Sequence, residues 1–549
     1  MKQLNLRTLE LMLGSKIAAS MLAVALFFGV TAASAQTFTF SKLYNFGTST
    51  GDPRNPGWPG VFAQGRDGNL YSTSQAGGIG SGTVFQLTPA GKVKVLYQFP
   101  GGTERSGLTL GTDGYLYGTT FTLGSYGEGS VFKIATDGTG YKTLYSFKAG
   151  TSGYNPSTAP IQGVDGNFYG TTTYGITGPG SVYKMTPAGV LTTLHNFDKT
   201  HGFDPTALMQ ATDGNFYGTT LGGGTLNGGP SINGVIFKMT AAGKFTVLHN
   251  FTGTDGQNPY GPIIQASDGN LYGTTRTGGS SGYGVVYKIT PAGVYTVLHN
   301  FKAFGAGSGP FAGLVQATDG KFYGATTGPG NILYQITSAG IYTILYTFTP
   351  TTGQLPFVSL FQNTNGILYS DTAGGGTGSL CKCGVAYSLN AGLHPFVALV
   401  TTSGKAGQTI EILGNGLTGT TSVKFGTGSA SFTVVSDTYM TAVVPATGTT
   451  GAVTVTTPSG FRVSSKNFRV LPVISSFSPT SGPVASQVVI TGTGLTQTTK
   501  VTFGGVAATN FTKSATQVTA IVPTGAVTGK IGITTAGGTA TSATVFTVF

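Results

Sequence analysis

Charged residues are scarce in this chain, since Asp, Glu, Lys and Arg together make up 8% of its 549 residues. Low charge alone would be compatible with disorder, but Val, Ile, Phe, Tyr and Thr are abundant, and these residues favour strands. The 90 glycines stand where turns between strands would fall. No stretch after the N-terminal segment has a convincing 3.6-residue apolar period, which argues against helices. We therefore expect an all-β protein, divided into several domains because of its length.

Runs of basic residues are absent as well. The formal net charge of +12 suits an acidic polymer as partner, yet the Lys and Arg residues are scattered along the chain. Without a basic cluster, nucleic acid is not an expected partner. Nucleophile, zinc-protease and phosphate-loop motifs do not occur in a convincing context. The sequence therefore predicts no cofactor and names no catalytic residue.

Long apolar runs are limited to one, at residues 17–30, which follows a basic start. Ala33-Ser34-Ala35 then has the small-x-small form of a cleavage site. We expect residues 1–35 to be a signal peptide, so that the mature chain begins at Gln36, is exported and has no membrane span. An uncleaved membrane anchor is the alternative, although the run is short for a span.

An Asp-Gly pair recurs about every 50 residues. "DGNFYGTT" begins at Asp165 and Asp213, and "DGNLYGTT" begins at Asp268. The full series is Asp67, Asp113, Asp165, Asp213, Asp268 and Asp319, followed by the degenerate Asn365-Gly366. Each copy reads as four strands joined by hairpin turns. Repeats of this length are typical of propeller blades or solenoid units.

The two ends of the repeat region favour a closed ring. Residues 40–46 match the fourth strand of later copies, such as residues 298–301, whereas residues 393–396 after the seventh copy depart from that pattern. The N-terminal segment is therefore expected to complete the last copy, which removes exposed sheet edges. We predict a seven-bladed β-propeller over residues 36–394, with an open β-solenoid as the alternative.

These repeats resemble the GloVer tandem-repeat proteins, whose pattern is "DGNLYGTT…GG…G-VFK-T". All seven copies carry it, over roughly residues 37–394. The resemblance implies an exported bacterial surface protein with varied C-terminal anchors, and it implies no established activity.

The remaining residues contain a different unit of about 80 residues, present twice. Gly414-Asn415-Gly416-Leu417 in the first copy corresponds to Gly492-Thr493-Gly494-Leu495 in the second. Both resemble IPT/TIG domains, the first copy more weakly. We expect two immunoglobulin-like β-sandwiches, at residues 395–471 and 472–549. The resemblance implies DNA-binding support in transcription factors and spacer or adhesive modules in exported proteins, and the signal segment favours the second role.

A glutamine stands three residues before most Asp-Gly turns, while the second copy has Leu110 there. If the first strand lines a central channel, these amides form a ring around it that binds an ion or sugar, or a structural layer that bonds neighbouring backbone. The structural layer is the favoured interpretation. The ring consists of Gln64, Gln162, Gln210, Gln265, Gln316 and Gln362.

No metal site is predicted. One Asp per turn lacks the clustered oxygen ligands of a calcium loop. Three histidines recur at one repeat position, but other copies hold Tyr44, Tyr97, Tyr145 and Tyr346 there, so the position suits a flat ring rather than a ligand. The three are His195, His249 and His299. Cys381 and Cys383 face the same side of a strand. A disulfide, free thiols and opportunistic metal binding all remain open for this pair.

The loops differ between the two faces of the predicted propeller. Turns joining first to second and third to fourth strands are short and uniform, whereas the other loops are long, variable and rich in aromatic, Asn and Arg residues. We name the face that carries the long loops the long-loop face. Its composition suits sugar stacking or protein contact, although such rings also pack long loops. The candidate ligand-binding residues are Arg54, Trp58, Tyr126, Tyr154, Tyr174, Tyr260, Arg276 and Tyr283.

Four acids on the long loops, Glu104, Glu128, Asp204 and Asp255, keep an enzymatic alternative open, because a catalytic pair needs two close carboxylates. The favoured hypothesis is a non-catalytic, extracellular, cell-surface or periplasmic binding or adhesion protein. Its long-loop face would recognise a glycan or a surface protein. The alternatives are a propeller glycosidase or lyase and a purely structural surface-layer component.

Overall fold

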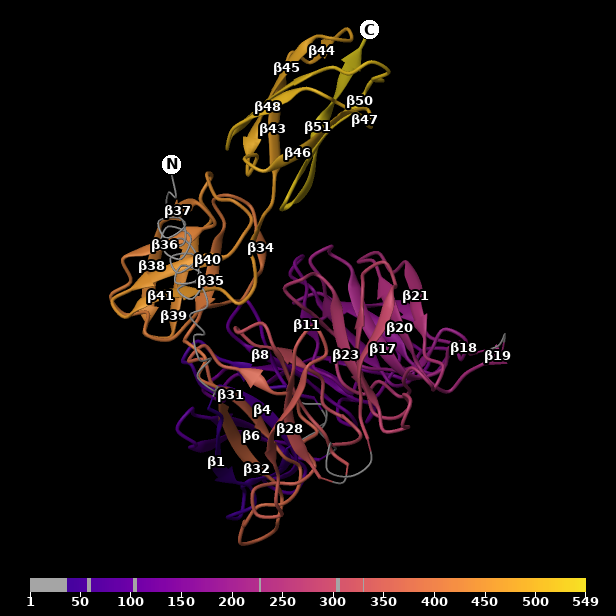
Figure 1. Ribbon diagram of the computed structural model, residues 1–549, viewed down its shortest axis with the longest axis vertical. Helices are drawn as coiled ribbons and strands as arrows, with labels where there is room; N and C mark the ends of the chain where they lie inside the picture. Colours follow the sequence, from indigo (N-terminus) through magenta and orange to yellow (C-terminus); the bar gives the residue numbers. More distant parts are fainter. Residues whose placement is uncertain (1–36, 57–60, 102–105, 227–228, 303–306, 329) are drawn as a thin grey trace, which may run out of the picture.

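The computed structural model describes residues 37–549 except 57–60, 102–105, 227–228, 303–306 and 329 (Figure 1). The predicted signal peptide lies outside these residues. The described chain consists of β-strands, with no α-helix among its elements. No helix that could span a membrane is found in these ranges. The expected all-β class is therefore confirmed.

Within the described residues, seven repeat sheets share one order, in which each strand pairs with the next along the chain. The first sheet contains β3 (Ala63–Gln64), β4 (Leu70–Gly77), β5 (Thr83–Leu87) and β6 (Val93–Gln98), with β2 (Pro53–Pro56) added beside β4. The second contains β7 (Thr109–Leu110), β8 (Leu116–Thr120), β9 (Ser130–Ile134) and β10 (Lys142–Ser146). The third contains β11 (Ile161–Gln162), β12 (Phe168–Thr172), β13 (Ser181–Met185) and β14 (Leu191–Asn196). The fourth is β16 (Met209–Gln210), β17 (Phe216–Gly222), β20 (Val235–Met239) and β21 (Phe245–Asn250), with β15 (Phe203–Pro205) beside β17 and a hairpin of β18 (Thr225–Leu226) and β19 (Gly229–Pro230).

The last three repeat sheets follow the same plan. They are β22 (Ile264–Gln265), β23 (Leu271–Thr275), β24 (Val285–Ile289) and β25 (Tyr295–Asn300); β26 (Val315–Gln316), β27 (Phe322–Ala325), β28 (Ile332–Ile336) and β29 (Tyr342–Thr347); and β30 (Phe361–Gln362), β31 (Leu368–Asp371), β32 (Val385–Asn390) and β1 (Thr39–Asn45). Strand β1 pairs antiparallel with β32, and Thr39 lies opposite Asn390. This pairing confirms that the N-terminal segment completes the last sheet.

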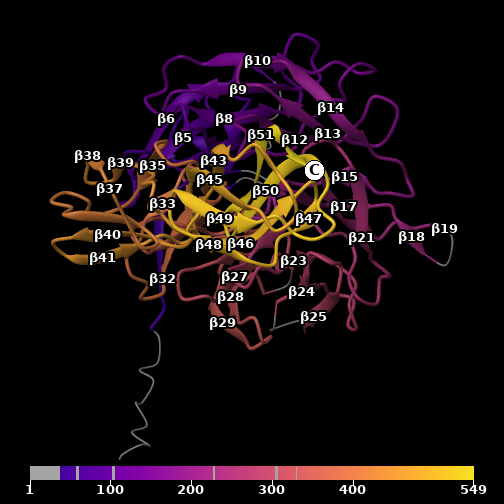
Figure 2. The same cartoon turned by 90° about the horizontal axis from the view of Figure 1, so that it is seen from above.

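The repeat sheets surround a common axis as in a β-propeller (Figure 2). The fourth strands β10, β25 and β29 lie at the periphery, and the strand numbers fall toward the centre. The first strand of each sheet is therefore the innermost one. It runs from the long-loop face to the Asp-Gly turn, so the residues that precede it stand at the inner rim of the long-loop face.

The repeated octamer forms a turn centred on a carboxylate. Asp165 accepts hydrogen bonds from Asn167 N at 3.1 Å, Asn167 Nδ2 at 2.8 Å and Tyr169 Oη at 2.8 Å. Lys184 on β13 adds an ion pair at 2.9 Å. Burial alone would raise the pKa of Asp165, but the hydrogen bonds from Lys184, Asn167 and Tyr169 outweigh it and lower the pKa to about 2. The carboxylate is thus engaged within its own turn, which explains why the same residues recur from copy to copy of the repeat.

The six predicted glutamines form a layer that we name the glutamine belt. Gln210 Oε1 accepts the Val164 N–H of the preceding sheet at 2.9 Å, and Gln210 Nε2 donates to Gly214 O at 3.0 Å. The other links between a backbone N–H and the glutamine Oε1 of the next sheet are Thr112–Gln162, Thr212–Gln265, Ser267–Gln316, Thr318–Gln362 and Thr364–Gln64. The belt therefore joins adjacent innermost strands, as its structural interpretation predicts, with Leu110 at the interruption.

Residues after 394 form two further pairs of sheets, each with its own apolar core. The first pair is β33 (Ala398–Leu399), β35 (Thr409–Leu413), β39 (Tyr439–Val443) and β38 (Phe432–Ser436) against β37 (Gly428–Ala430), β36 (Ser422–Phe425), β40 (Val453–Thr457) and β41 (Gly460–Val463), with β34 (Ser403–Gly404) pairing β42 (Arg469–Val470). The second pair is β43 (Val473–Ser478), β45 (Gln487–Thr493), β49 (Gln517–Ile521) and β48 (Phe511–Lys513) against β44 (Ser481–Gly482), β51 (Gly538–Val548), β50 (Gly529–Thr535), β46 (Thr498–Phe503) and β47 (Val506–Ala507).

The first sandwich rests on the Asp-Gly turns of the repeat sheets. Arg66, in the turn between β3 and β4, donates to Glu411 through Nε at 3.1 Å and Nη2 at 2.5 Å. Its guanidinium also lies 4.9 Å from the ring centroid of Tyr439. On the last sheet, Thr364 Oγ1 donates to Gly414 O at 2.8 Å, and across the ring Arg469 Nη1 donates to Thr212 O. The sandwich thus contacts the face opposite the long loops (Figure 1).

Glu411→Gln should weaken this docking by about 1 kcal/mol, because the pair is partly buried and bidentate but still reached by solvent. Asp437→Asn is the matched control, since Asp437 accepts the N–H groups of Gly416 and Thr418 inside the same sandwich. Small-angle scattering at low and high salt would report docking. We expect a larger radius of gyration for the Glu411 variant already at low salt, with little further change at high salt because no ion pair remains to be screened. An equal change in both variants would contradict a specific role of the ion pair.

Candidate ligand-binding face

Three aromatic rings from consecutive repeats meet at the inner rim of the long-loop face. Tyr260, Phe311 and Phe357 each stand five residues before a belt glutamine, in the segment that leads into the innermost strand. The ring centroids of Tyr260 and Phe311 lie 4.3 Å apart with an interplanar angle of 30°, and those of Phe311 and Phe357 lie 4.8 Å apart. We name these three residues the aromatic arc. Phe311, at its centre, is only 4% exposed, whereas Tyr260 and Phe357 on its two sides are half-buried and reach the surface.

Arg276 places a positive charge beside the aromatic arc. It follows β23 directly, and its Cζ lies 5.5 Å from the ring centroid of Tyr260 and 5.1 Å from that of Phe311. These cation–π contacts restrict the guanidinium, while the side chain stays exposed. The geometry therefore joins two predicted residues, Tyr260 and Arg276, into one cluster.

A second pair of predicted residues lies on another repeat. The rings of Tyr154 and Tyr174 stack at 4.7 Å, and Tyr154 N donates to Tyr174 O at 2.8 Å. Tyr126 is 55% exposed, with Lys148 Nζ 5.1 Å from its ring centroid, and Tyr283 is 41% exposed. Among the described residues these rings make no ring contact with the aromatic arc. The predicted face is thus divided into separate aromatic spots.

The last two candidate ligand-binding residues are Arg54 and Trp58. Arg54 lies on β2 opposite Ala76 of β4, and its Nε is buried without a hydrogen-bond partner in the described chain. Trp58 lies outside the described residues. Conversely, the sequence-based candidates omitted Phe311 and Phe357, and counting back five residues from each belt glutamine would have found both.

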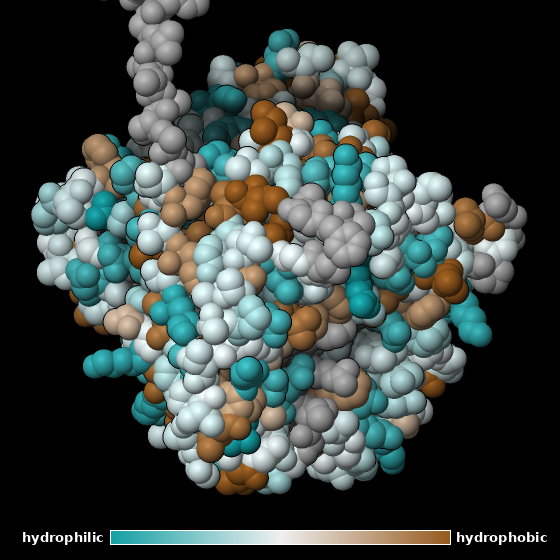
Figure 3. Space-filling model, turned by 60° about the horizontal axis from the view of Figure 1, so that its bottom comes forward, coloured by the Kyte–Doolittle hydropathy of each residue, from teal (hydrophilic) through white to brown (hydrophobic). Residues whose placement is uncertain are grey.

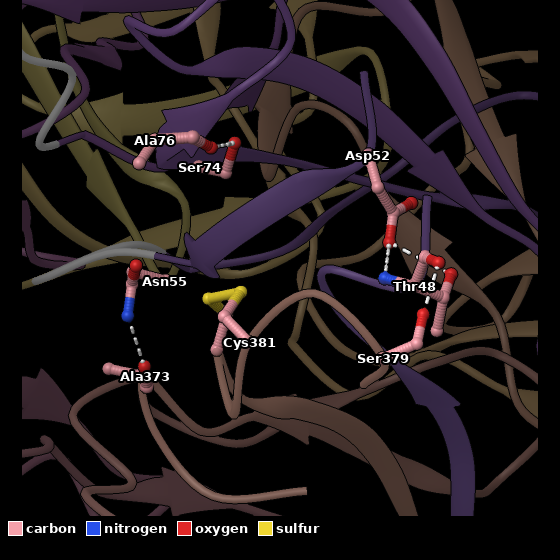
Figure 4. Close-up of a disulfide and its surroundings, with 9 residues drawn as sticks. Thr48, Asp52, Asn55, Ser74, Ala76, Ala373, Ser379 and Cys381 are labelled. Atoms are coloured by element: carbon pink, nitrogen blue, oxygen red, sulfur yellow. Dashed lines mark hydrogen bonds between the residues drawn. A yellow bond between two sulfur atoms is a disulfide. The ribbon is translucent and has the colours of Figure 1, made fainter. Parts of the chain in front are cut away.

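An Asn-Pro step fixes several long loops. Asn55, Asn155 and Asn258 all have positive φ, between 49° and 56°. Their side-chain amides donate to backbone oxygens of the preceding repeat, at 2.8 Å to Ala373 for Asn55 (Figure 4), 2.6 Å to Phe121 for Asn155 and 2.8 Å to Leu221 for Asn258. These bonds tie each of these three loops to the preceding repeat.

Cys381 and Cys383 form a disulfide in the last long loop (Figure 4). The loop also bonds the N-terminal segment, because Leu380 N donates to Gly47 O at 3.0 Å and Ser379 Oγ donates to Thr48 O at 2.6 Å. The disulfide therefore braces the junction at which the ring closes.

The three repeat histidines are stacked rings. The imidazoles of His195, His249 and His299 each lie 4.0 Å from an aromatic ring of the next repeat, namely Phe245, Tyr295 and Tyr342. Burial lowers the pKa of His195 and of His299. These positions explain why tyrosine can replace histidine in the other repeats.

The long-loop acids have separate environments. Asp255 accepts from Thr252 N at 2.8 Å and lies 3.0 Å from His249 Nε2. Glu128 accepts the Ala149 N–H. Asp204 occupies the slot of the positive-φ asparagines, with φ 51°, and burial raises its pKa. Glu104 lies outside the described residues. No hydrogen bond joins two of the three described acids, and each has partners or surroundings of its own.

Figure 3 shows the side of the molecule away from the two sandwiches. Its apolar side chains lie in small patches among polar ones.

Comparison with solved structures gives distant similarities only. A streptogramin B lyase is 16% identical, covering 64% of this chain and 97% of its own, with a TM-score of 0.46. The virginiamycin B lyase of Staphylococcus aureus is 15% identical, covering 64% and 99%, with a TM-score of 0.46. A fungal alcohol oxidase is 14% identical, covering 79% and 99%, with a TM-score of 0.43. Scores this low carry no inference about activity, and no curated protein matches the sequence.

Family comparison is more informative. The IPT/TIG domain matches residues 472–548. The Gloeobacter/Verrucomicrobia repeat matches four overlapping segments, residues 27–177, 58–229, 175–386 and 223–434. Because these segments span more than half of the chain, the protein belongs to the Gloeobacter/Verrucomicrobia repeat family and carries a C-terminal IPT/TIG domain.

Proposed function

We propose that the protein is an exported, non-catalytic binding or adhesion protein of the cell surface or extracellular space. Each repeat sheet is one blade of a seven-bladed propeller over residues 36–394, and the long-loop face binds a glycan. Residues 395–471 and 472–549 are two IPT/TIG-type sandwiches that act as a spacer. The observation that carries this proposal is the aromatic arc on the face opposite the docked sandwich.

The arc suits a sugar because pyranose rings have apolar faces that stack on aromatic side chains. Tyr260 and Phe357 are half-buried and reach the surface, and both pack against the buried Phe311, so an oligosaccharide can contact these two rings. The Asn-Pro steps hold the surrounding loops in place, which reduces the entropy lost on binding. A shallow and rigid aromatic edge favours recognition of a polymer over enclosure of a small substrate.

Three other functions are outcomes of the test. A propeller glycosidase or lyase would need two carboxylates about 5–10 Å apart around the bound sugar. A surface-protein partner would use the same exposed rings as anchors, and a purely structural component would self-associate instead. The separate environments of Glu128, Asp204 and Asp255 favour the non-catalytic function.

Tyr260→Ala should weaken glycan binding about 10-fold, because it removes one stacking ring and loosens Phe311. Phe461→Ala is the matched control, since Phe461 is an exposed aromatic residue on β41 of the first sandwich and not on the long-loop face. Glycan arrays would identify ligands, and calorimetry would measure their affinities for both variants. No binding to any glycan on the array would contradict the proposed glycan binding. Shortening of a bound glycan over time would favour the glycosidase or lyase function.

A further inference from the structure

The acids of the long-loop face are mostly engaged inside the protein. Asp52 is 6% exposed and accepts from Tyr44 Oη at 2.7 Å and Thr48 N at 2.9 Å. Glu128 and Asp255 bind loop N–H groups, and Asp198 pairs with His201 at 2.9 Å. Burial favours the neutral form of Asp204, since it raises the pKa of that carboxyl. Most of these carboxylates are therefore held by groups of the protein itself, and Asp198, whose side chain is 60% exposed, is the exception.

In contrast to the acids, the basic side chains of the same face make no ion pair among the described residues. They are Arg54, Lys148, Lys199, Arg276, Lys302 and Lys382, of which all but Arg54 are exposed. The whole chain adds to this field, with a formal net charge of +12. The long-loop face thus presents positive charge beside the aromatic arc.

Arg276 is the basic residue best placed to contact a bound sugar. Its guanidinium rests against Tyr260 and Phe311, yet its side-chain N–H groups make no hydrogen bond within the described chain. A guanidinium held by two rings loses little freedom when it binds, and its planar donors match a carboxylate or sulfate in a bidentate way.

We propose that the ligand of the aromatic arc is an acidic polysaccharide, in which Arg276 binds an anionic group of the sugar whose ring stacks on Tyr260. This inference rests on the proposed function and deepens it by naming the chemical class of the glycan. The anionic group is a carboxylate or a sulfate ester, and these two sources share the chemistry that Arg276 recognises.

The test uses pairs of oligosaccharides that differ only in charge. Oligogalacturonate is compared with its methyl ester, hyaluronan with its methyl ester, and heparin with desulfated heparin, each by calorimetry on the purified full chain. For at least one pair we expect the charged form to bind 10-fold or more tighter at low salt. Arg276→Gln should abolish that preference, and Arg276→Lys should restore part of it. Lys424→Gln, an exposed lysine on β36, removes the same charge elsewhere and should change nothing.

The outcomes separate the two proposals. Equal binding of the charged and neutral forms in every pair overturns the acidic ligand and leaves glycan binding intact. A charge preference that survives in Arg276→Gln overturns the role of Arg276. If no member of any pair binds and neutral glycans fail as well, glycan binding itself is wrong. Galacturonate or hyaluronan as the preferred ligand identifies a carboxylate, and heparin identifies a sulfate.

Discussion

Asp371→Asn should raise the free energy of unfolding by about 1–3 kcal/mol at neutral pH, which is the usual cost of a buried polar group without a partner. Asp371 ends β31, is 0% exposed, and neither carboxylate oxygen has a hydrogen-bond partner in the described chain. Burial raises its pKa well above the ordinary value. Asparagine keeps the shape of the side chain and removes the charge.

The repeat explains why an acid is unfavourable there. Asp371 stands where other repeats have a threonine whose hydroxyl donates to the backbone of the next blade. Thr119 Oγ1 donates to Thr158 O at 3.1 Å, and Thr171 Oγ1 donates to Thr206 O at 3.0 Å. A donor thus fills this position in five repeats and Ala325 fills it in the sixth, whereas a carboxylate brings a charge without a donor and an asparagine amide supplies the donor.

The expected gain depends on pH in a defined direction. The folded-state pKa of Asp371 is raised, so the favourable protonated form is fully populated below about pH 4, the ordinary pKa of an unfolded aspartate. As the pH rises from there through the folded-state pKa, this contribution to stability is lost. Asp371→Asn should therefore gain most at pH 8 and least at pH 4.

Urea unfolding of both proteins at pH 4, 6 and 8 would measure this difference. Asp255→Asn is the contrasting variant, because Asp255 accepts a hydrogen bond from Thr252 N and loses a favourable partner. A gain that is equal at pH 4 and pH 8, or a loss at pH 8, would show that Asp371 is not an unpaired acid in the folded protein.

The repeat chemistry was accessible from the sequence because it is local. The Asp165 turn, the strands on each side and the pairing of β1 with β32 follow from residue types at fixed spacing. The belt role of Gln210 was also predictable, since a glutamine at the same place in nearly every copy indicates a shared structural task.

Contacts between repeats were less accessible. The packing of Phe311 between Tyr260 and Phe357 depends on the angle between neighbouring sheets, which no residue spacing encodes. The docking of Arg66 on Glu411 joins residues 345 positions apart, in a turn where the other repeats carry other residues. A pattern read along one chain does not reveal such pairs.

Gln210→Leu should lower the free energy of unfolding by about 0.5–1.5 kcal/mol, because it removes the hydrogen bonds to the Val164 N–H and the Gly214 carbonyl, which water can partly replace. Leucine already occupies the belt position in the second repeat, at Leu110, so its size fits the site and the change isolates the hydrogen bonds. Hydrogen exchange gives a local readout: the Val164 amide should exchange faster, while the Ser267 amide, bound by Gln316, stays protected.

Leu110→Gln tests the same principle in the opposite direction. A glutamine there would stand where the belt is interrupted, at the repeat that follows Arg66, and should raise stability by about 0.5–1.5 kcal/mol. Loss of stability in both variants would mean that the belt position is governed by packing alone. A loss for Gln210→Leu with a gain for Leu110→Gln would mean that amide links between innermost strands hold adjacent blades together. The single interruption would then be a weakness of the ring, at the site where Arg66 instead binds the first sandwich.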